Sequence, residues 1–192
     1  MARGDIYRTK GGGTIVGFDH AVFGKAAASQ AASLRALYFR TAKNMNRKGI
    51  FQWNTQYPDK ARILRDIEDG TLYLLEHEGR PVAAAAVNDS LEIEDDPPPE
   101  TIWSQPGPAR VIHRLCVDPR LQGQGLGKRL LAGIEDAALA AGVKSLCLMV
   151  LAANPFAVGL YTSFGFTVRH TYPVEDFGEF LFIEKTAGAS YA

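Results

Sequence analysis

Three closely spaced glycines mark the stretch of this sequence where the backbone itself is suited to binding a ligand. In CVDPRLQGQGLGKRLL, residues 116–131, Gly123, Gly125 and Gly127 alternate with other residues, and Lys128 follows the last of them. Glycine lets the main chain adopt a positive φ or approach a ligand closely. The apolar helical pattern that begins here supplies unpaired N–H groups at a helix start. Together these residues predict an anion site, most often one for phosphate.

Two common phosphate-binding motifs do not fit the glycine run. A P-loop would require glycine where the chain has Gln122, and Ser or Thr where it has Arg129. The dinucleotide pattern G-x-G-x-x-G would require glycine at Lys128 or Leu130. Both nucleotide motifs are therefore excluded.

A third pattern, Q/R-x-x-G-x-G/A, fits with Gln122, Gly125 and Gly127 between a predicted strand and a predicted helix. On these residues the chain resembles the GNAT superfamily of N-acetyltransferases, in which this segment holds the pyrophosphate of acetyl-CoA. A second segment, ANPFAVGLYTSFGF at residues 153–166, is similar to another recurring part of that family. There Asn154 can cap a helix whose first position is Pro155. The resemblance extends over roughly residues 14–187 and is strongest between 111 and 166.

The resemblance implies acetyl-CoA as co-substrate and a set of residues that bind it. The pantetheine arm would lie alongside the strand that precedes the glycine loop, where one backbone N–H would stabilise the oxyanion. Lys128 would add positive charge beside the pyrophosphate, and Arg129 is a second candidate for that role. The implied coenzyme-binding residues are Leu115, Cys116, Val117, Gln122, Gly123, Gln124, Gly125, Leu126, Gly127, Lys128 and Asn154.

Two side chains are candidates for proton transfer. The resemblance places Tyr161 beside the coenzyme sulfur, where a phenol that is protonated at neutral pH could act as general acid toward the leaving thiolate. His113 could act as general base, because its imidazole titrates near neutrality and strand alternation would place it on the same face as Leu115. Arg114 would point the other way. A tyrosine that packs its helix and a histidine satisfied within the sheet remain the alternatives.

Cysteine chemistry and metal chemistry find little support. Cys116 and Cys147 both lie in apolar runs typical of buried strands, which favours reduced thiols over a disulfide. Cys116 has no base on its own face that would activate it as an acyl-carrying nucleophile. The histidines outside the predicted site have no Cys or carboxylate at ligand spacing, so we expect no metal site.

The amine that would accept the acetyl group has to be inferred from segments outside the coenzyme site. Trp53 and Tyr57, in FQWNTQYP, could form an aromatic wall or a cation–π contact, and packing of that loop onto the sheet is the alternative. A loop of carboxylates could attract a cationic amine or could simply be solvated. We expect a small primary amine, while polyamines, aminoglycosides, amino acids and protein N-termini stay open. The carboxylates of this loop are Glu92, Glu94, Asp95, Asp96 and Glu100.

The elements that position these residues alternate between helix and strand and include hairpins. This pattern predicts an α/β (α+β) fold with a mixed sheet of six to seven strands and helices on both faces, as in the GNAT domain. Residues 1–13 are predicted to be a flexible lead, and residues 14–192 a single domain. Asp19 is expected to cap the first helix, and Gly49 to end it. We expect strands at 14–19, 71–78, 81–89, 109–118, 145–153, 166–174 and 179–186, and helices at 20–45, 59–69, 127–142 and 155–164.

Composition argues against several classes of partner. Lysines and arginines number 21 and equal the aspartates and glutamates, so no net field attracts nucleic acid or a membrane surface. No apolar run reaches the length of a membrane span or a signal peptide, so we expect a cytoplasmic protein. Family members are often dimers, which leaves a homodimer open. The alternatives in function are a CoA-binding regulatory module without turnover, a transferase acting on a protein N-terminus, and one using a longer acyl chain.

Overall fold

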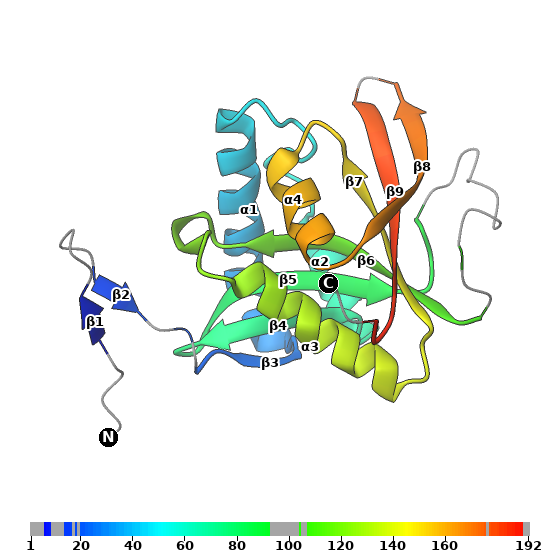
Figure 1. The fold of residues 1–192 in the computed structure, drawn as a ribbon. Helices are drawn as coiled ribbons and strands as arrows, with labels where there is room; N and C mark the ends of the chain where they lie inside the picture. The colour runs from blue at the N-terminus through cyan, green and yellow to red at the C-terminus, as the bar shows by residue number, and fades with distance from the viewer. Residues whose placement is uncertain are drawn as a thin grey trace.

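The computed structural model describes residues 6–8, 14–16, 18, 20–92, 104, 107–175 and 177–189, and its elements form one main sheet flanked by helices (Figure 1). None of the described helices is long and apolar enough to cross a membrane. The strands are β1 (Ile6–Arg8), β2 (Thr14–Val16), β3 (Val22–Lys25), β4 (Leu72–His77), β5 (Arg80–Asn88), β6 (Ala109–Val117), β7 (Ser145–Leu151), β8 (Thr167–Val174) and β9 (Gly178–Thr186). The helices are α1 (Ala31–Arg47), α2 (Lys60–Glu68), α3 (Leu126–Ala140) and α4 (Pro155–Ser163), with short 3-10 turns at Ala28–Gln30 and Pro119–Leu121.

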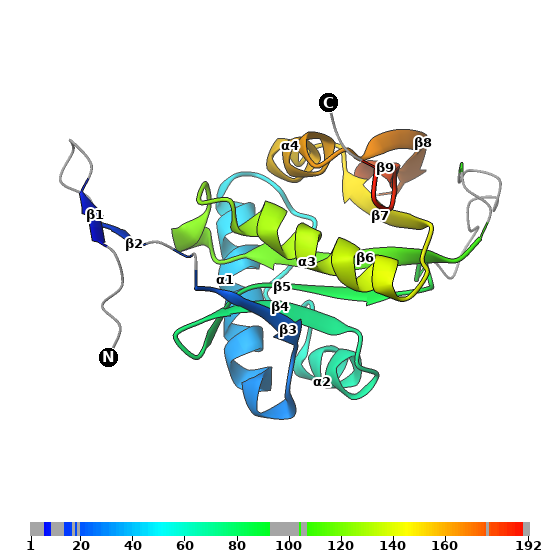
Figure 2. The same cartoon turned by 60° about the horizontal axis from the view of Figure 1, so that its bottom comes forward.

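The main sheet has seven strands in the order β3-β4-β5-β6-β7-β9-β8. Every neighbouring pair is antiparallel except β6 and β7, which are parallel. Helices α1 and α2 cover one face of the sheet and α3 covers the other (Figure 2). The predicted mixed sheet with helices on both faces is therefore confirmed.

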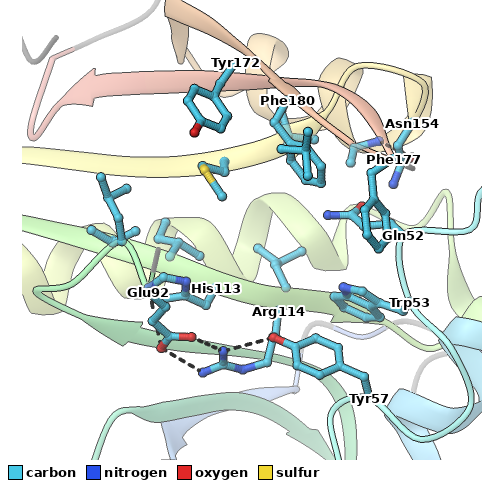
Figure 3. Close-up of a pocket in the computed structure, with 18 of the residues that line it drawn as sticks. Gln52, Trp53, Tyr57, Glu92, His113, Arg114, Asn154, Tyr172, Phe177 and Phe180 are labelled. Carbon is cyan, nitrogen blue, oxygen red and sulfur yellow. Dashed lines mark hydrogen bonds and ion pairs between the residues drawn. The ribbon is translucent and has the colours of Figure 1, made fainter. Parts of the chain in front are cut away.

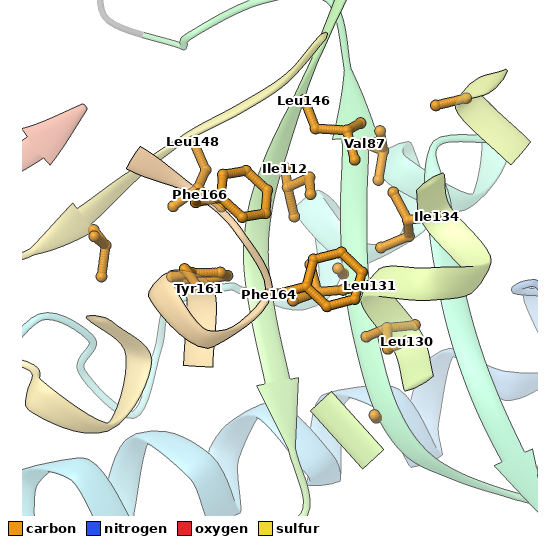
Figure 4. Packing of buried hydrophobic residues seen from close by; sticks show 14 of the residues in the cluster. Val87, Ile112, Leu130, Leu131, Ile134, Leu146, Leu148, Tyr161, Phe164 and Phe166 are labelled. Carbon is orange, nitrogen blue, oxygen red and sulfur yellow. The ribbon is translucent and has the colours of Figure 1, made fainter. Parts of the chain in front are cut away.

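Strand β5 separates two hydrophobic cores. Ala83, Ala85 and Val87 face a core that contains Leu130, Leu131 and Ile134 of α3 together with Tyr161, Phe164 and Phe166 (Figure 4). Ala84 and Ala86 face the other core, which is built largely from α1 and includes Leu34, Leu37 and Tyr38. The small alanine side chains let helices on both faces approach the same strand, since interiors pack to a high and uniform density.

The two halves of the sheet separate after a short contact between β6 and β7. Their ladder is confined to Ala109–Val111 opposite Ser145–Cys147. Beyond it, β7 continues with β9 and β8, and Figure 2 shows these strands and α4 set off from the plane of β3–β6. Among the described residues, the edge of the second half of β6 that faces β7 has no partner strand, so its backbone is open to a ligand.

The predicted helix at 20–45 is wrong at its start. Residues Val22–Lys25 form β3, which pairs with β4, and α1 begins only at Ala31. Phe23 explains the difference, because its ring stacks on Tyr73 of β4, with centroids 5.4 Å apart. The gain from packing this ring on the sheet outweighs the helix propensity of the alanines that follow. Gln30, which makes no side-chain cap, stands at the N-cap, and the predicted cap Asp19 lies outside the described residues.

The predicted first strand also differs from expectation. Thr14–Val16 forms β2, which pairs with β1 (Ile6–Arg8) in a separate two-stranded sheet. Three residues of the predicted lead therefore form a strand. The other predicted strands and helices are present, and their ends differ from the expected ones by at most two residues.

Candidate active site

The glycine loop leads directly into the N-terminus of α3. Gly123 and Gly125 have φ of 82° and 76°, a left-handed conformation that other residues adopt only at a cost. Gly125 is the N-cap of α3 and supplies no side-chain cap, so the first N–H groups of the helix lack a capping partner from that residue. A Cβ on either glycine would meet no atom within 4 Å, so both glycines border open space. A helix start left open in this way is suited to an anion.

A cavity of about 470 Å³ opens beside this loop, where the sequence implies a coenzyme site. Its walls come from the end of α1, the second half of β6, the glycine loop and α4. Gln124 is exposed and does not line the cavity, unlike the other predicted coenzyme residues. Those that line it are Leu115, Cys116, Val117, Gln122, Gly123, Gly125, Leu126, Gly127, Lys128 and Asn154.

The two basic residues after the glycines have different surroundings. Lys128 is exposed and lines the cavity. Arg129 donates from its guanidinium to the carbonyl oxygens of Phe18 and Ala21, the latter at 2.6 Å. Arg129 thus fastens α3 to the chain before β3, and Lys128 is the residue placed to supply charge to an anion.

Helix α4 brings Tyr161 to the cavity. Asn154 caps the helix, since its Oδ1 accepts from the N–H of Ala157 at 3.2 Å, and Pro155 occupies the first turn as the sequence predicts. Tyr161 is 7% exposed, and its ring meets Phe166 edge-on at 5.7 Å. Burial raises the pKa of Tyr161 above its usual value, so the phenol remains protonated at neutral pH.

Strand β6 contains an irregularity that changes which side chains share a face. Arg114 has a positive φ of 51°, and the register with β5 shifts so that Arg114 and Leu115 both lie opposite Ala85. His113 pairs with Ala86 and faces the α1 core, whereas Leu115 packs against the α3 core. The prediction that His113 and Leu115 share a face is therefore wrong, because a β-bulge reverses the alternation between them.

Because of the same bulge, the expectation that Arg114 points away from His113 is wrong. Its guanidinium and the ring of His113 both approach Glu92, so Arg114 does not point away from His113. Arg114 donates to both carboxylate oxygens of Asp66 at 3.0 Å and to Glu92 at 2.7 Å, and it reaches the hydroxyl of Tyr57 at 3.4 Å. This buried guanidinium connects β6, α2 and the loop that carries Tyr57.

The hydrogen bonds of His113 determine which ring nitrogen carries its proton. Nε2 lies 2.9 Å from Oδ1 of Asn88 and 2.8 Å from the carbonyl oxygen of Ser90. Both partners are acceptors, because Nδ2 of Asn88 donates to Glu92 at 2.8 Å and so orients the amide. Nε2 must therefore be the protonated nitrogen, which leaves Nδ1 to accept a proton. Burial lowers the pKa of His113, an effect that outweighs the nearby charge of Glu92 and keeps the ring neutral at pH 7.

A second cavity, of about 770 Å³, also has Tyr161 in its lining. Figure 3 shows the side chains around it. His113 and Arg114 line it, as do both predicted acceptor residues. Trp53 is 8% exposed and packs edge-on against Tyr38 at 5.9 Å, so it is both a core residue and a wall of the cavity. Tyr57 is 43% exposed, which leaves its ring available to a ligand.

One wall of this second cavity is not predicted from the sequence. Tyr172, Phe177 and Phe180, from the β8–β9 hairpin, form a wall opposite Trp53 and Tyr57 (Figure 3). The aromatic residues between 172 and 182 are the sequence feature that points to this wall. The hairpin lies more than 110 residues after Trp53, so the sequence does not show that the two face each other. In the sequence Glu92 is one acid of a loop, and in the structure it is bound by Arg114 and Arg62. Glu94, Asp95, Asp96 and Glu100 lie outside the described residues.

Cys116 lines the first cavity but is unsuited to nucleophilic catalysis. Burial raises the pKa of its thiol to about 12, despite hydrogen bonds that act in the other direction. The thiolate, which is the nucleophilic form, is scarce at neutral pH. Proton transfer between bound groups is the chemistry that this site can provide.

The two cavities meet at one set of residues. Met45, Leu115, Asn154, Ala157 and Tyr161 line both of them. A ligand on the glycine loop and a second ligand beside His113 would therefore come together at Tyr161, which is the proximity that group transfer requires.

The chain matches known proteins in sequence. The model of the Acetyltransferase (GNAT) family matches residues 31–166. The [Ribosomal protein bS18]-alanine N-acetyltransferase of Escherichia coli is 42% identical over 64 residues, which make up 32% of this chain and 43% of that enzyme. The chain thus spans less than half the length of the curated relatives that it matches.

Solved structures show the same fold over nearly the whole chain. A GNAT family acetyltransferase from Streptococcus agalactiae superposes with a TM-score of 0.72 at 18% identity, covering 88% of this chain and 96% of that one. The PaiA N-acetyltransferase of Thermoplasma acidophilum, solved in complex with coenzyme A, gives a TM-score of 0.66 at 14% identity, covering 86% of this chain and 98% of that one. At these identities the likeness is one of fold.

Proposed function

This chain belongs to the GNAT acetyltransferase family, and from that premise we propose that it transfers the acetyl group of acetyl-CoA directly to a primary amine. The observation that carries the proposal is the junction of the two cavities at Tyr161. One cavity has the open helix start and lysine that suit the pyrophosphate of the coenzyme. The other offers an imidazole nitrogen with a lone pair beside the space for an amine.

In the proposed reaction, each of two side chains transfers one proton. The amine nitrogen forms a bond to the acetyl carbonyl carbon, and the bond from that carbon to the coenzyme sulfur breaks. Nδ1 of His113 takes a proton from the amine, directly or through water, and the hydroxyl of Tyr161 gives a proton to the departing thiolate. A backbone N–H from Leu115–Val117 stabilises the oxyanion, an interaction worth about 10²–10³ in rate.

A small-molecule amine is the proposed acceptor. The second cavity, about 770 Å³ in volume, lies within the range of roughly 300–1,000 Å³ typical of small-ligand sites. A protein N-terminal amine is the second candidate, favoured by the name of the E. coli relative, which acts on an alanine of a ribosomal protein. That relative matches over 64 residues, about a third of this chain.

The test compares wild type with Tyr161→Phe. We expect calorimetric titration with CoA to give the same dissociation constant for both within about twofold, because only a hydroxyl is removed. The variant should release free thiol from acetyl-CoA about 10²–10⁴ times more slowly in the presence of a reactive amine, since it lacks the general acid. Tyr73→Phe is the matched control, because Tyr73 lies on β4 and lines neither cavity.

Three results would change the proposal. Absence of CoA binding by the folded protein would remove its basis. Binding of CoA without thiol release for any amine or peptide would favour a regulatory module. Unchanged turnover in Tyr161→Phe would show that another group protonates the thiolate.

A further inference from the structure

Aromatic rings enclose the second cavity on two sides. Trp53 and Tyr57 come from the segment between α1 and α2, and Phe177 and Phe180 come from the β8–β9 hairpin opposite (Figure 3). The rings of Phe177 and Phe180 contact each other edge-on, with centroids 6.4 Å apart. Rings that face each other across a cavity can pack on a flat apolar group placed between them.

Two of these rings are more exposed than a folded protein usually leaves large aromatic side chains. Tyr57 is 43% exposed and Phe177 is 48% exposed, and both line the cavity. Burying this surface under a ligand would be favourable in proportion to the apolar area that leaves water. The cavity therefore favours an apolar occupant.

The charges of Arg114 and Glu92 at the cavity are already compensated within the protein. Arg114 is bound by Asp66 and Glu92, and Glu92 is bound in turn by Arg114 and Arg62. Burial alone would raise the pKa of Glu92, but the hydrogen bonds and charge of Arg114, the nearby His113 and the hydrogen bond from Asn88 outweigh it and lower that pKa to about 2. Among the described residues that line the cavity, Arg114 is the one Lys or Arg, and Glu175 is an exposed carboxylate. A ligand carboxylate would compete with Asp66 and Glu92 for Arg114, and a polycation would compete with Arg114 and Arg62 for Glu92.

We propose that the acceptor is a small primary amine on an apolar skeleton that carries a ring, with the ring held between the segment of Trp53 and Tyr57 and the β8–β9 hairpin. This inference rests on the proposed acetyl transfer and specifies the acceptor of the same site. The amine nitrogen would lie toward His113 and Tyr161, and it would undergo the bond changes and proton transfers given above.

The first experiment measures thiol release from acetyl-CoA with acceptors that differ by one feature. 2-Phenylethylamine carries the ring, ethylamine lacks it, phenylalanine adds a carboxylate, spermidine adds positive charges, and a hexapeptide with an N-terminal alanine represents a protein N-terminus. We expect kcat/KM for 2-phenylethylamine to exceed that of each other acceptor by about tenfold or more, because a buried ring contributes binding that the others lack or offset.

A second experiment tests the wall of the cavity. Phe177→Ala should lower the ratio of kcat/KM for 2-phenylethylamine to that for ethylamine by about tenfold, since it removes one ring that packs on the ligand. Phe39→Ala is the matched control: Phe39 is 45% exposed on α1 and lines neither cavity. Its ratio should equal that of wild type.

The outcomes separate the acceptor class from the proposed function. Equal or faster turnover of phenylalanine, spermidine or the peptide would overturn the acceptor class while leaving acetyl transfer in place. So would CoA binding with no release from 2-phenylethylamine, or a ratio unchanged by Phe177→Ala. Failure to bind CoA in calorimetry would instead reject the acetyltransferase itself.

Discussion

At the scale of single residues, the proton chemistry depends on the amide of Asn88. This side chain accepts from Nε2 of His113 and donates to Glu92, so its orientation is fixed from both ends. The charged groups near His113 are Glu92, Arg114 and Arg62. Because Nε2 is held as a donor, Nδ1 is the atom that can accept the proton of an amine, and Asn88 acts as a positioning residue.

Asn88→Asp should raise the pKa of His113. A carboxylate at the position of Oδ1 would stabilise the imidazolium, by about one pKa unit or more. The limb of the kcat/KM profile that reports the histidine should shift to higher pH by the same amount, because the neutral ring is the active base and is lost as the pH falls through its pKa. Histidine resonances in ¹⁵N NMR spectra would measure the pKa and the protonated nitrogen without any need for turnover.

His113→Gln is the reference variant for this prediction. The histidine limb should disappear from its pH profile, and kcat/KM should fall by about 10²–10⁴. A limb that stays at the same pH in both variants would assign the titration to another group. His113 would then be a structural histidine, satisfied by Asn88 and Ser90.

At the scale of elements, α3 is placed by a close contact with β3. A Cβ on Gly133 would lie 2.5 Å from the ring of Phe23, which is itself stacked on Tyr73. Gly133 thus lets α3 approach the edge strand β3. This strand lies within residues 20–45, for which the sequence predicts a helix. The glycine loop at the start of α3 is positioned by this packing.

Gly133→Ala should therefore destabilise the protein, although alanine is the better helix former. Moving the Phe23 ring to admit a methyl group should cost about 1–3 kcal/mol in the free energy of unfolding. Gly159→Ala in α4 is the matched control, because nothing lies within 4 Å of its added Cβ. This control should gain about 0.5–1 kcal/mol. Urea unfolding would measure both, and equal effects would show that the Phe23 contact is unimportant.

At the scale of the whole molecule, buried ion pairs make stability depend on pH. Asp118 is 2% exposed and is bound by Arg40 and Arg120 at 2.8 and 2.7 Å. Burial alone would raise its pKa, but these partners and the N–H of Arg120 outweigh that effect and lower it to about 2. A carboxyl group with a lowered folded-state pKa stabilises the fold above its unfolded value and loses that contribution as the pH falls through the folded pKa.

We expect Asp118→Asn to lose about 1–2 kcal/mol of the free energy of unfolding at pH 7. The difference from wild type should shrink between about pH 4 and pH 2, because acid protonates Asp118 in the native protein and removes the same charge. Urea unfolding at several pH values would measure it, with Asp136→Asn on the exposed face of α3 as the control. A difference that stays constant with pH would show that the substitution acts through packing.

Local features of the chain could be predicted because neighbouring residues decide them. The spacing of Gln122, Gly125 and Gly127 indicated an anion-binding helix start, and the family match confirms the GNAT resemblance. Asn154 before Pro155 indicated the cap of α4, which its hydrogen bond to Ala157 confirms. The assignments of His113 and Tyr161 to catalysis stay predictions, as do the cytoplasmic location and the homodimer.

The residue pattern indicates which segments form the glycine loop, α4 and most strands, since capping, glycine conformation and hydrophobic periodicity act over a few residues. Which side chains meet depends on how these segments pack in three dimensions. The bulge at Arg114 turned His113 away from the face of Leu115, and the β8–β9 hairpin added a wall opposite Trp53. Ladder register and long-range packing produce both features, because they depend on the partner strand and on residues distant in the chain.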